Sequence, residues 1–242
     1  MSEQQEIKTA QQTDAKDKPN SGFFGNLIFN ILIPVVIMSY ASSDEWLGPA
    51  WSIVAALAFP ICYGLWDLKV AGKVNAFSIL GIVSVLLTGG ISLLELPAEY
   101  IAIKEATIPA LIGLAVIITQ YTHKPLVKIL VLNDQIINWP HLDKVLAEKG
   151  KVDEFEKKVA NSSYIVASSF FLSAVLNYVL AKVILVSPPG TTEYTEELGR
   201  MTALSYPVIV IPSMILLITA LWYLFAQIKK ITGEDIEDFI NQ

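Results

Sequence analysis

The fold is decided by the stretch Ile101-Ala102-Ile103-Lys104-Glu105-Ala106-Thr107-Ile108-Pro109, which places a cation beside an anion inside an apolar run. A charge at membrane depth costs roughly 2.5 to 3.5 kcal/mol on insertion scales, so such residues normally face a bundle interior and have a partner. The surrounding run, Glu99–Tyr121, is long enough to cross about 30 Å of hydrocarbon. The stretch therefore predicts a transmembrane helix whose two charged residues face a bundle interior and have partners there.

The composition of the whole chain is that of an integral membrane protein. Of its 242 residues, 53% are hydrophobic and 17% are charged, whereas a soluble domain has about 25% charged residues. The apolar runs do not alternate between apolar and polar residues as the strands of a membrane β-barrel do. We therefore expect an all-α polytopic membrane protein.

Six runs approach the length that a membrane-spanning helix needs, about 20 residues. Their predicted bounds are Phe23–Ala41, Leu47–Trp66, Val74–Leu94, Glu99–Tyr121, Tyr164–Val186 and Met201–Gln227. The chain then divides into a disordered cytoplasmic tail (1–21), transmembrane helices 1–4 (22–122), a cytoplasmic connector (123–163), transmembrane helices 5 and 6 (164–228) and a second cytoplasmic tail (229–242). The first tail is predicted to be disordered because it has almost no apolar residues with which to form a core.

The distribution of basic residues predicts the orientation. Fourteen of the 17 Lys and Arg residues lie in the two tails, in the loop between the second and third spans, and in the connector. Loops on the cytoplasmic side of a membrane carry the excess of Lys and Arg. Both termini and the connector are therefore expected in the cytoplasm.

The connector contains its own helical signals. Leu126–Ile137 has an apolar stripe typical of an interfacial helix. Pro140 is expected to start a short helix that ends at Gly150. Asp153 and Glu156 have the spacing of a capping box, and a helix from there could continue into the fifth span for about 33 residues, or about 50 Å. The connector is either a solvated link that orders the bundle or a surface that docks a partner.

Five ionisable residues from four spans are predicted to lie in one layer near the outer face. They are Glu95, Lys104, Glu105, Lys182 and Arg200. One interpretation is a buried ion-pair network that fixes the rotation of the helices. The other is a water-filled vestibule that binds an ion or a small charged solute, since perturbed charges mark functional sites as well as structural networks.

Uncharged polar and helix-bending residues also occur in the spans. Asn26 and Asn30 share one face of the first span, and Asn177 lies near the middle of the fifth, where hydrogen bonds between helices are expected. Prolines that remove a backbone hydrogen bond and favour kinks are Pro34, Pro60, Pro109, Pro207 and Pro212. Glycines that permit close helix contacts are Gly81, Gly89, Gly90 and Gly113.

The sequence gives little support to an enzyme. His123 and His141 have no partner at a metal-site spacing, and Cys62 is the only cysteine. The patterns Gly-x-Ser-x-Gly, Walker A and His-Glu-x-x-His do not occur. No basic stripe with interleaved aromatic residues points to nucleic acid. We therefore expect no catalytic residue, no metal and no cofactor.

Several runs resemble a bacterial family of multi-span inner-membrane proteins that is similar to the intracellular septation protein A family. They are Phe29–Pro34, Ser84–Gly90, Ile103–Pro109, Ser169–Asn177 and Leu198–Pro207. The similarity to septation protein A itself depends on His123–Lys128, which resembles a basic Lys-Pro-Leu-Ile-Lys stretch of that family, and on Leu176-Asn177 followed by Ala181. The acid in Lys104-Glu105 departs from that family's pattern.

The resemblance implies a protein of the Gram-negative inner membrane that acts in envelope maintenance or cell division through contacts with other membrane proteins. It implies no chemistry. The sequence thus favours a non-enzymatic protein whose partners are the lipid bilayer and other inner-membrane proteins. The alternative is a small transporter or channel that binds an ion or charged solute in the outer polar layer. The oligomeric state and the partner are left open.

Overall fold

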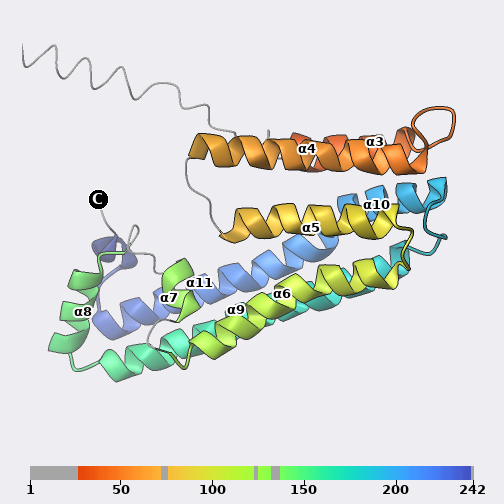
Figure 1. Ribbon diagram of the computed structural model, residues 1–242. Helices are drawn as coiled ribbons and strands as arrows, with labels where there is room; N and C mark the ends of the chain where they lie inside the picture. The colour runs from red at the N-terminus through yellow and green to blue at the C-terminus, as the bar shows by residue number, and fades with distance from the viewer. Residues whose placement is uncertain (1–26, 72–75, 123–124, 132–136, 241–242) are drawn as a thin grey trace, which may run out of the picture. The chain divides into compact units, whose positions relative to one another are not determined.

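The computed structural model of the protein describes residues 27–71, 76–122, 125–131 and 137–240 (Figure 1). Every regular element in these ranges is a helix, and the one extended feature is an isolated bridge between Ile137 and Ile240. The predicted disordered tail, His123 and Asn26 lie outside the described residues. The all-α fold class is therefore confirmed for the described chain.

Four helices are long and apolar enough to cross a membrane. Their bounds are Gly48–Trp66, Glu99–Thr119, Val152–Ile184 and Thr192–Thr232. The first and third predicted spans correspond to shorter apolar helices, described over Ile28–Tyr40 and Ile79–Leu93. The protein is a multi-pass membrane protein, and the count of six spans stays a prediction.

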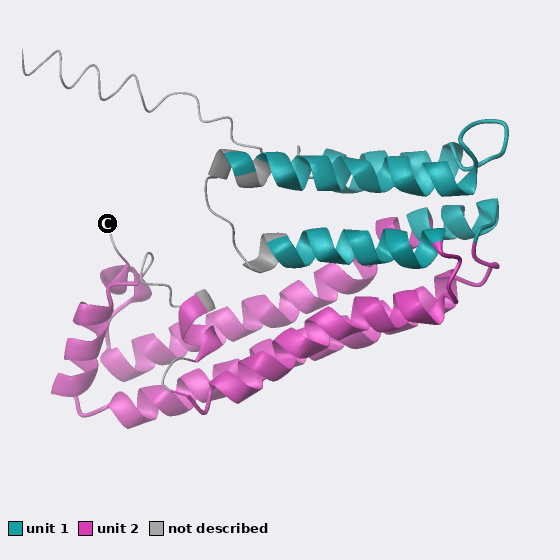
Figure 2. Cartoon of the chain, in the orientation of Figure 1, with its two compact units in different colours: residues 1–93, 190–199 teal, residues 94–189, 200–242 magenta. Residues whose placement is uncertain are grey.

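The chain forms two compact units (Figure 2). Unit 1 contains residues 1–93 and 190–199, and unit 2 contains residues 94–189 and 200–242. One continuous helical segment, made of α10 (Thr192–Ser205), the π-helix η2 (Tyr206–Val210) and α11 (Ile211–Thr232), contributes to both. The sequence predicted a helix beginning only at Met201, so the observed helix starts nine residues earlier.

In unit 1, α4 (Gly48–Ala71) packs against both α3 (Ile33–Tyr40) and α5 (Ala76–Leu93). Glycine allows two of the close approaches. A Cβ added at Gly89 would lie 2.8 Å from Leu57 Cδ1, and one at Gly199 would lie 3.0 Å from Met38 Cβ. The predicted close contact is therefore confirmed at Gly89.

In unit 2, α6 (Glu99–Thr119) and α9 (Val152–Ile184) form an antiparallel pair. Lys182 near the end of α9 contacts Glu99 at the start of α6. At the opposite end, the Tyr121 and Tyr164 hydroxyls lie 3.1 Å apart. Midway, a Cβ at Gly113 would lie 3.3 Å from Phe170 Cβ, so the backbone of α6 approaches α9 closely there. Over 21 residues, α6 is about 31 Å long, which matches the hydrocarbon thickness.

α9 also packs against α11, through hydroxyl groups that bond to the neighbouring backbone. Ser162 Oγ donates to the Ala220 carbonyl at 3.2 Å, and Ser169 Oγ donates to the Ser213 carbonyl at 2.7 Å. The two serines are seven residues apart, and so are the two acceptors in the reverse direction. This reversed seven-residue spacing is that of an antiparallel helix pair. Small residues and interhelical hydrogen bonds of this kind hold helices together in membranes.

One end of unit 2 is a small packed domain that we call the end module (residues 126–131, 137–163 and 224–240). It contains α7 (Leu126–Val131), α8 (Trp139–Glu148), the first turns of α9, the last turns of α11 and the 3₁₀-helix η3 (Ile236–Phe239) (Figure 1). Phe155, Leu142, Leu146 and Phe239 are buried in its core. The predicted C-terminal tail is therefore folded as far as Ile240.

Backbone and polar contacts close the end module. Gly233, with φ of 74°, ends α11 and turns the chain toward η3. The Asn138 N–H donates to the Phe239 carbonyl at 2.7 Å, and the Lys149 ammonium donates to the Thr232 carbonyl. The C-terminal residues thus pack on the connector helix α8.

The local predictions for the connector have mixed outcomes. The 33-residue helix is confirmed as α9, and the short helix as α8, which ends before Gly150. The capping box is wrong, because α9 begins at Val152 after Lys151, which makes no side-chain cap. The interfacial helix is described only over Leu126–Val131.

Two of the five prolines in the predicted spans, Pro34 and Pro212, lie just after π-helical turns, whereas Pro60 and Pro109 lie inside the α-helices α4 and α6. In η1 (Ile28–Leu32) and η2, the residue just before Pro34 or Pro212 donates its N–H five residues back, Ile33 to Ile28 and Ile211 to Tyr206. Proline lacks an N–H, so one carbonyl four residues before it loses its helical partner, and the local widening accommodates the ring. The sequence predicted bends at these prolines, and the bends stay a prediction; the π-helical turns were not predicted.

We expect the α6–α9 contact at Gly113 to be sensitive to side-chain volume. Gly113→Leu should lower the free energy of unfolding in detergent by about 1–3 kcal/mol, as overpacking does elsewhere. Gly81→Leu is the matched control, because no described atom lies within 4 Å of its added Cβ. Equal unfolding midpoints for the two variants would contradict the close α6–α9 contact.

Candidate functional site

Lys104 and Glu105, the residues that drew attention in the sequence, form an ion pair inside α6. Lys104 Nζ lies 2.6 Å from Glu105 Oε1, and the two side chains are 8% and 27% exposed. Neighbouring residues on a helix point in different directions, so the long side chains must bend toward each other. The buried ammonium is thus neutralised by the residue next to it.

A second ion pair joins the two helices. Lys182 Nζ donates to Glu99 Oε1 at 2.8 Å, and the side chains are 43% and 57% exposed. Glu99 was not among the predicted site residues, although its position as the first residue of an outer helix end was visible in the sequence. What the sequence could not give is the register that places it beside Lys182.

The other two charged candidates stand apart from these pairs. Glu95 is exposed in the turn before α6, with φ of 53°. Arg200 is exposed within α10. Among the described residues, neither forms an ion pair with a group within 4 Å. Of the five candidates, Lys104 and Glu105 therefore pair with each other and Lys182 pairs with Glu99.

The asparagines have local roles. Asn177 Nδ2 donates to the Ser173 carbonyl at 2.8 Å and lies 3.3 Å from Ser173 Oγ, one turn earlier on its own helix. The expectation of a bond to another helix is not met by these contacts. Asn30 lies in the π-helical turn η1 of unit 1. Hydrogen bonds from α9 to α11 come instead from Ser162, Ser169 and Asn161, which the sequence did not single out.

Aromatic side chains mark the boundary between the spans and the end module. Tyr121 and Tyr164 meet at this level, and Asn161 Nδ2 donates to the Tyr223 hydroxyl at 3.3 Å. Tyrosine and tryptophan are typical of the membrane–water interface. We therefore expect the end module to lie outside the hydrocarbon.

Lys128 is the best-connected cation of the end module. It forms an ion pair with Glu156. Its Nζ also lies 5.6 Å from the centre of the Phe155 ring and 5.7 Å from that of Trp139. Cation–π contacts at such distances contribute about 0.5–1 kcal/mol each at exposed sites. Lys128 therefore ties α7 to α8 and α9.

Comparison with protein-family models, with curated proteins and with solved structures gave no match. Two cations on the unit 2 helices, Lys104 and Lys182, each have a carboxylate oxygen within 3 Å. Such pairs can hold helices in position, and a solute that bound at the buried Lys104–Glu105 pair would compete with an existing counterion.

We expect the Lys104–Glu105 pair to behave as a buried pair in a mutant cycle. Glu105→Gln should lower the free energy of unfolding by about 3 kcal/mol, because it leaves a buried ammonium without its counterion. The double variant Lys104→Met/Glu105→Leu should recover most of that loss. The free energy of unfolding of the parent protein and of the two variants is measured in mixed detergent micelles.

Lys182→Gln is the control for this cycle. The Lys182–Glu99 pair is much more exposed, and exposed pairs contribute only about 0–1 kcal/mol. The assignment of Lys104–Glu105 as a buried pair would be contradicted by either of two results. One is that Lys182→Gln lowers the free energy of unfolding as much as Glu105→Gln does; the other is that the double variant is less stable than Glu105→Gln.

Proposed function

We propose that the protein is a non-enzymatic, multi-pass protein of the bacterial inner membrane that acts by binding other envelope or division proteins, in the manner that its resemblance to septation protein A implies. The observation that carries the proposal is the end module. Its core is built from the connector, α9, α11 and the C-terminal residues. A mere link between spans would not need a buried core that includes Phe155 and Phe239.

The surface of the end module supports a docking role. Lys144 and Glu148 on α8 are 72% and 66% exposed, and Lys151 and Glu154 pair at the start of α9. Charged surfaces of both signs on rigid elements select partners by electrostatic complementarity. The module therefore offers a fixed, charged surface next to the spans.

The basic residues support a cytoplasmic position for this surface. Lys128, Lys144, Lys149 and Lys151 of the connector and Lys229 near the C-terminus all belong to or border the end module. By the positive-inside rule this end of unit 2 faces the cytoplasm. Division and envelope proteins of the cytoplasmic face are then the partners within reach.

Site-specific photocrosslinking in living cells tests the proposal. A photoreactive residue at Lys144 should give one or a few discrete protein adducts. The same residue at Ile118, which is 63% exposed on α6 within the span, is the control and should give none of those adducts.

The Phe239→Ala variant makes the test specific to the folded module. Removing a buried Phe costs about 3–5 kcal/mol in a core, so the adducts at Lys144 should disappear while membrane insertion is retained. Adducts that persist when Phe239→Ala has loosened the module, or no adduct at Lys144 in the parent protein, would contradict the proposal.

A transporter or channel predicts a different result. Ions or charged metabolites would then raise the melting temperature, and the rise would vanish in Lys104→Ala and Glu105→Gln. A thermal-shift screen with that outcome would replace the docking proposal by solute binding. The docking proposal predicts no solute whose stabilising effect depends on these two residues.

A further inference from the structure

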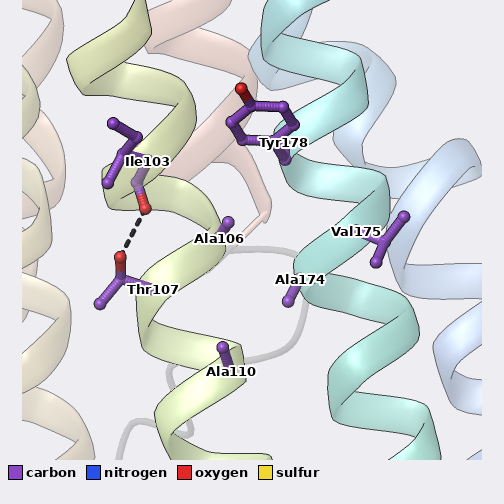
Figure 3. A pocket seen from close by; sticks show the side chains of 7 residues that line it. All are labelled: Ile103, Ala106, Thr107, Ala110, Ala174, Val175 and Tyr178. Carbon is purple, nitrogen blue, oxygen red and sulfur yellow. Dashed lines mark hydrogen bonds between the residues drawn. The ribbon is translucent and has the colours of Figure 1, made fainter.

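The surface of unit 2 contains a groove between α6 and α9. Its volume is about 390 Å³, and it is lined by Ile103, Ala106, Thr107, Ala110, Ala174, Val175 and Tyr178 (Figure 3). Alanines contributed by both helices face each other across it. The larger residues Ile103, Val175 and Tyr178 are 43–59% exposed. Small side chains thus open a space that larger ones border.

The groove is suited to hydrocarbon along its length. Thr107, one of its two polar residues, donates its hydroxyl to the Ile103 carbonyl at 2.6 Å, so this group is already satisfied within α6 (Figure 3). The remaining lining, apart from the Tyr178 hydroxyl, is aliphatic or aromatic carbon. A volume of about 390 Å³ lies in the range of small-molecule sites, about 300–1,000 Å³.

One end of the groove has charges of both signs. Glu99 is one turn before Ile103 on α6, and Lys182 is one turn after Tyr178 on α9, so each shares a face with a lining residue. The two form the 2.8 Å ion pair described above. An ammonium has three donors and a carboxylate about four acceptor sites. Since both side chains are substantially exposed, each can bind a further group.

We propose that this groove binds one acyl chain of a glycerophospholipid with a primary-amine headgroup. The lipid phosphate is bound by Lys182, the lipid ammonium by Glu99, and the Tyr178 hydroxyl donates to a phosphate or ester oxygen. The headgroup and the ion pair are complementary because each carries one positive and one negative charge side by side. Tyrosine is suited to this level, where an apolar ring meets polar headgroups.

Native mass spectrometry of the full-length protein tests the site, with phosphatidylethanolamine and phosphatidylglycerol as probes. The parent protein should retain one phosphatidylethanolamine at higher collision energy than phosphatidylglycerol. Ala106→Phe, which fills the groove, should lower the retained fraction of phosphatidylethanolamine at least about tenfold. Leu111→Phe adds the same ring at an exposed position of α6 outside the lining and should leave retention unchanged.

A second variant keeps the test valid if Ala106→Phe folds poorly. Lys182→Gln leaves the groove open and removes the phosphate contact, so it should weaken phosphatidylethanolamine binding while the melting temperature changes little. Soluble glycerophosphoethanolamine, which has the headgroup without acyl chains, should not displace the lipid.

Three outcomes would overturn the proposal. The first is equal retention of both lipids, which would remove the role of Glu99. The second is unchanged binding in both Ala106→Phe and Lys182→Gln. The third is a mass spectrum in which the parent protein retains a second copy of the chain instead of a lipid, and in which Ala106→Phe loses that second copy.

Discussion

Antiparallel packing of α6 on α9 is the constraint on which the rest of unit 2 depends. Helices in hydrocarbon gain little from burying apolar side chains against each other, so their association needs close backbone approach and hydrogen bonds. Gly113 supplies the approach on the α6 side. Ser162 and Ser169 supply the bonds on the α11 side of α9. α9 is therefore the common partner of both neighbours.

The position of the charges follows from this pairing. With the start of α6 beside the end of α9, Glu99 meets Lys182 and neutralises it at one end of the pair. Lys104 lies one and a half turns further along α6 than Glu99, where its side chain is buried. It is neutralised by Glu105 instead. The same register opens the alanine-lined groove beneath the first pair and brings the tyrosines together at the opposite end, where the end module begins.

The sequence predicted the features that depend on local chemistry. Length and apolarity identified the long helices, and Gly150 and Pro140 delimited α8. Features that depend on which helices meet were not accessible. Glu99 as the partner of Lys182 requires the α6–α9 register, and the burial of Phe239 requires a return of the C-terminus onto α8. The single polar layer predicted from the sequence pairs charges from different helices. In the structure the adjacent residues Lys104 and Glu105 pair with each other.

Cysteine crosslinking between α6 and α9 tests the antiparallel register most directly. In a Cys62→Ser background, Gly113→Cys with Phe170→Cys should form a disulfide in native membranes. A Cβ at Gly113 would lie 3.3 Å from Phe170 Cβ, slightly closer than the Cβ separation of about 3.5–4.5 Å found in disulfides, so a small shift of either helix brings the pair into range. A protease site is inserted at Gly150, between the two cysteines. After cleavage, a disulfide holds the two fragments together until it is reduced. Gly113→Cys with Ala181→Cys, three turns away on α9, should stay unlinked. A disulfide in the Gly113→Cys/Ala181→Cys protein, with none in the Gly113→Cys/Phe170→Cys protein, would contradict the register. It would also contradict the Lys182–Glu99 ion pair and the groove, which depend on that register.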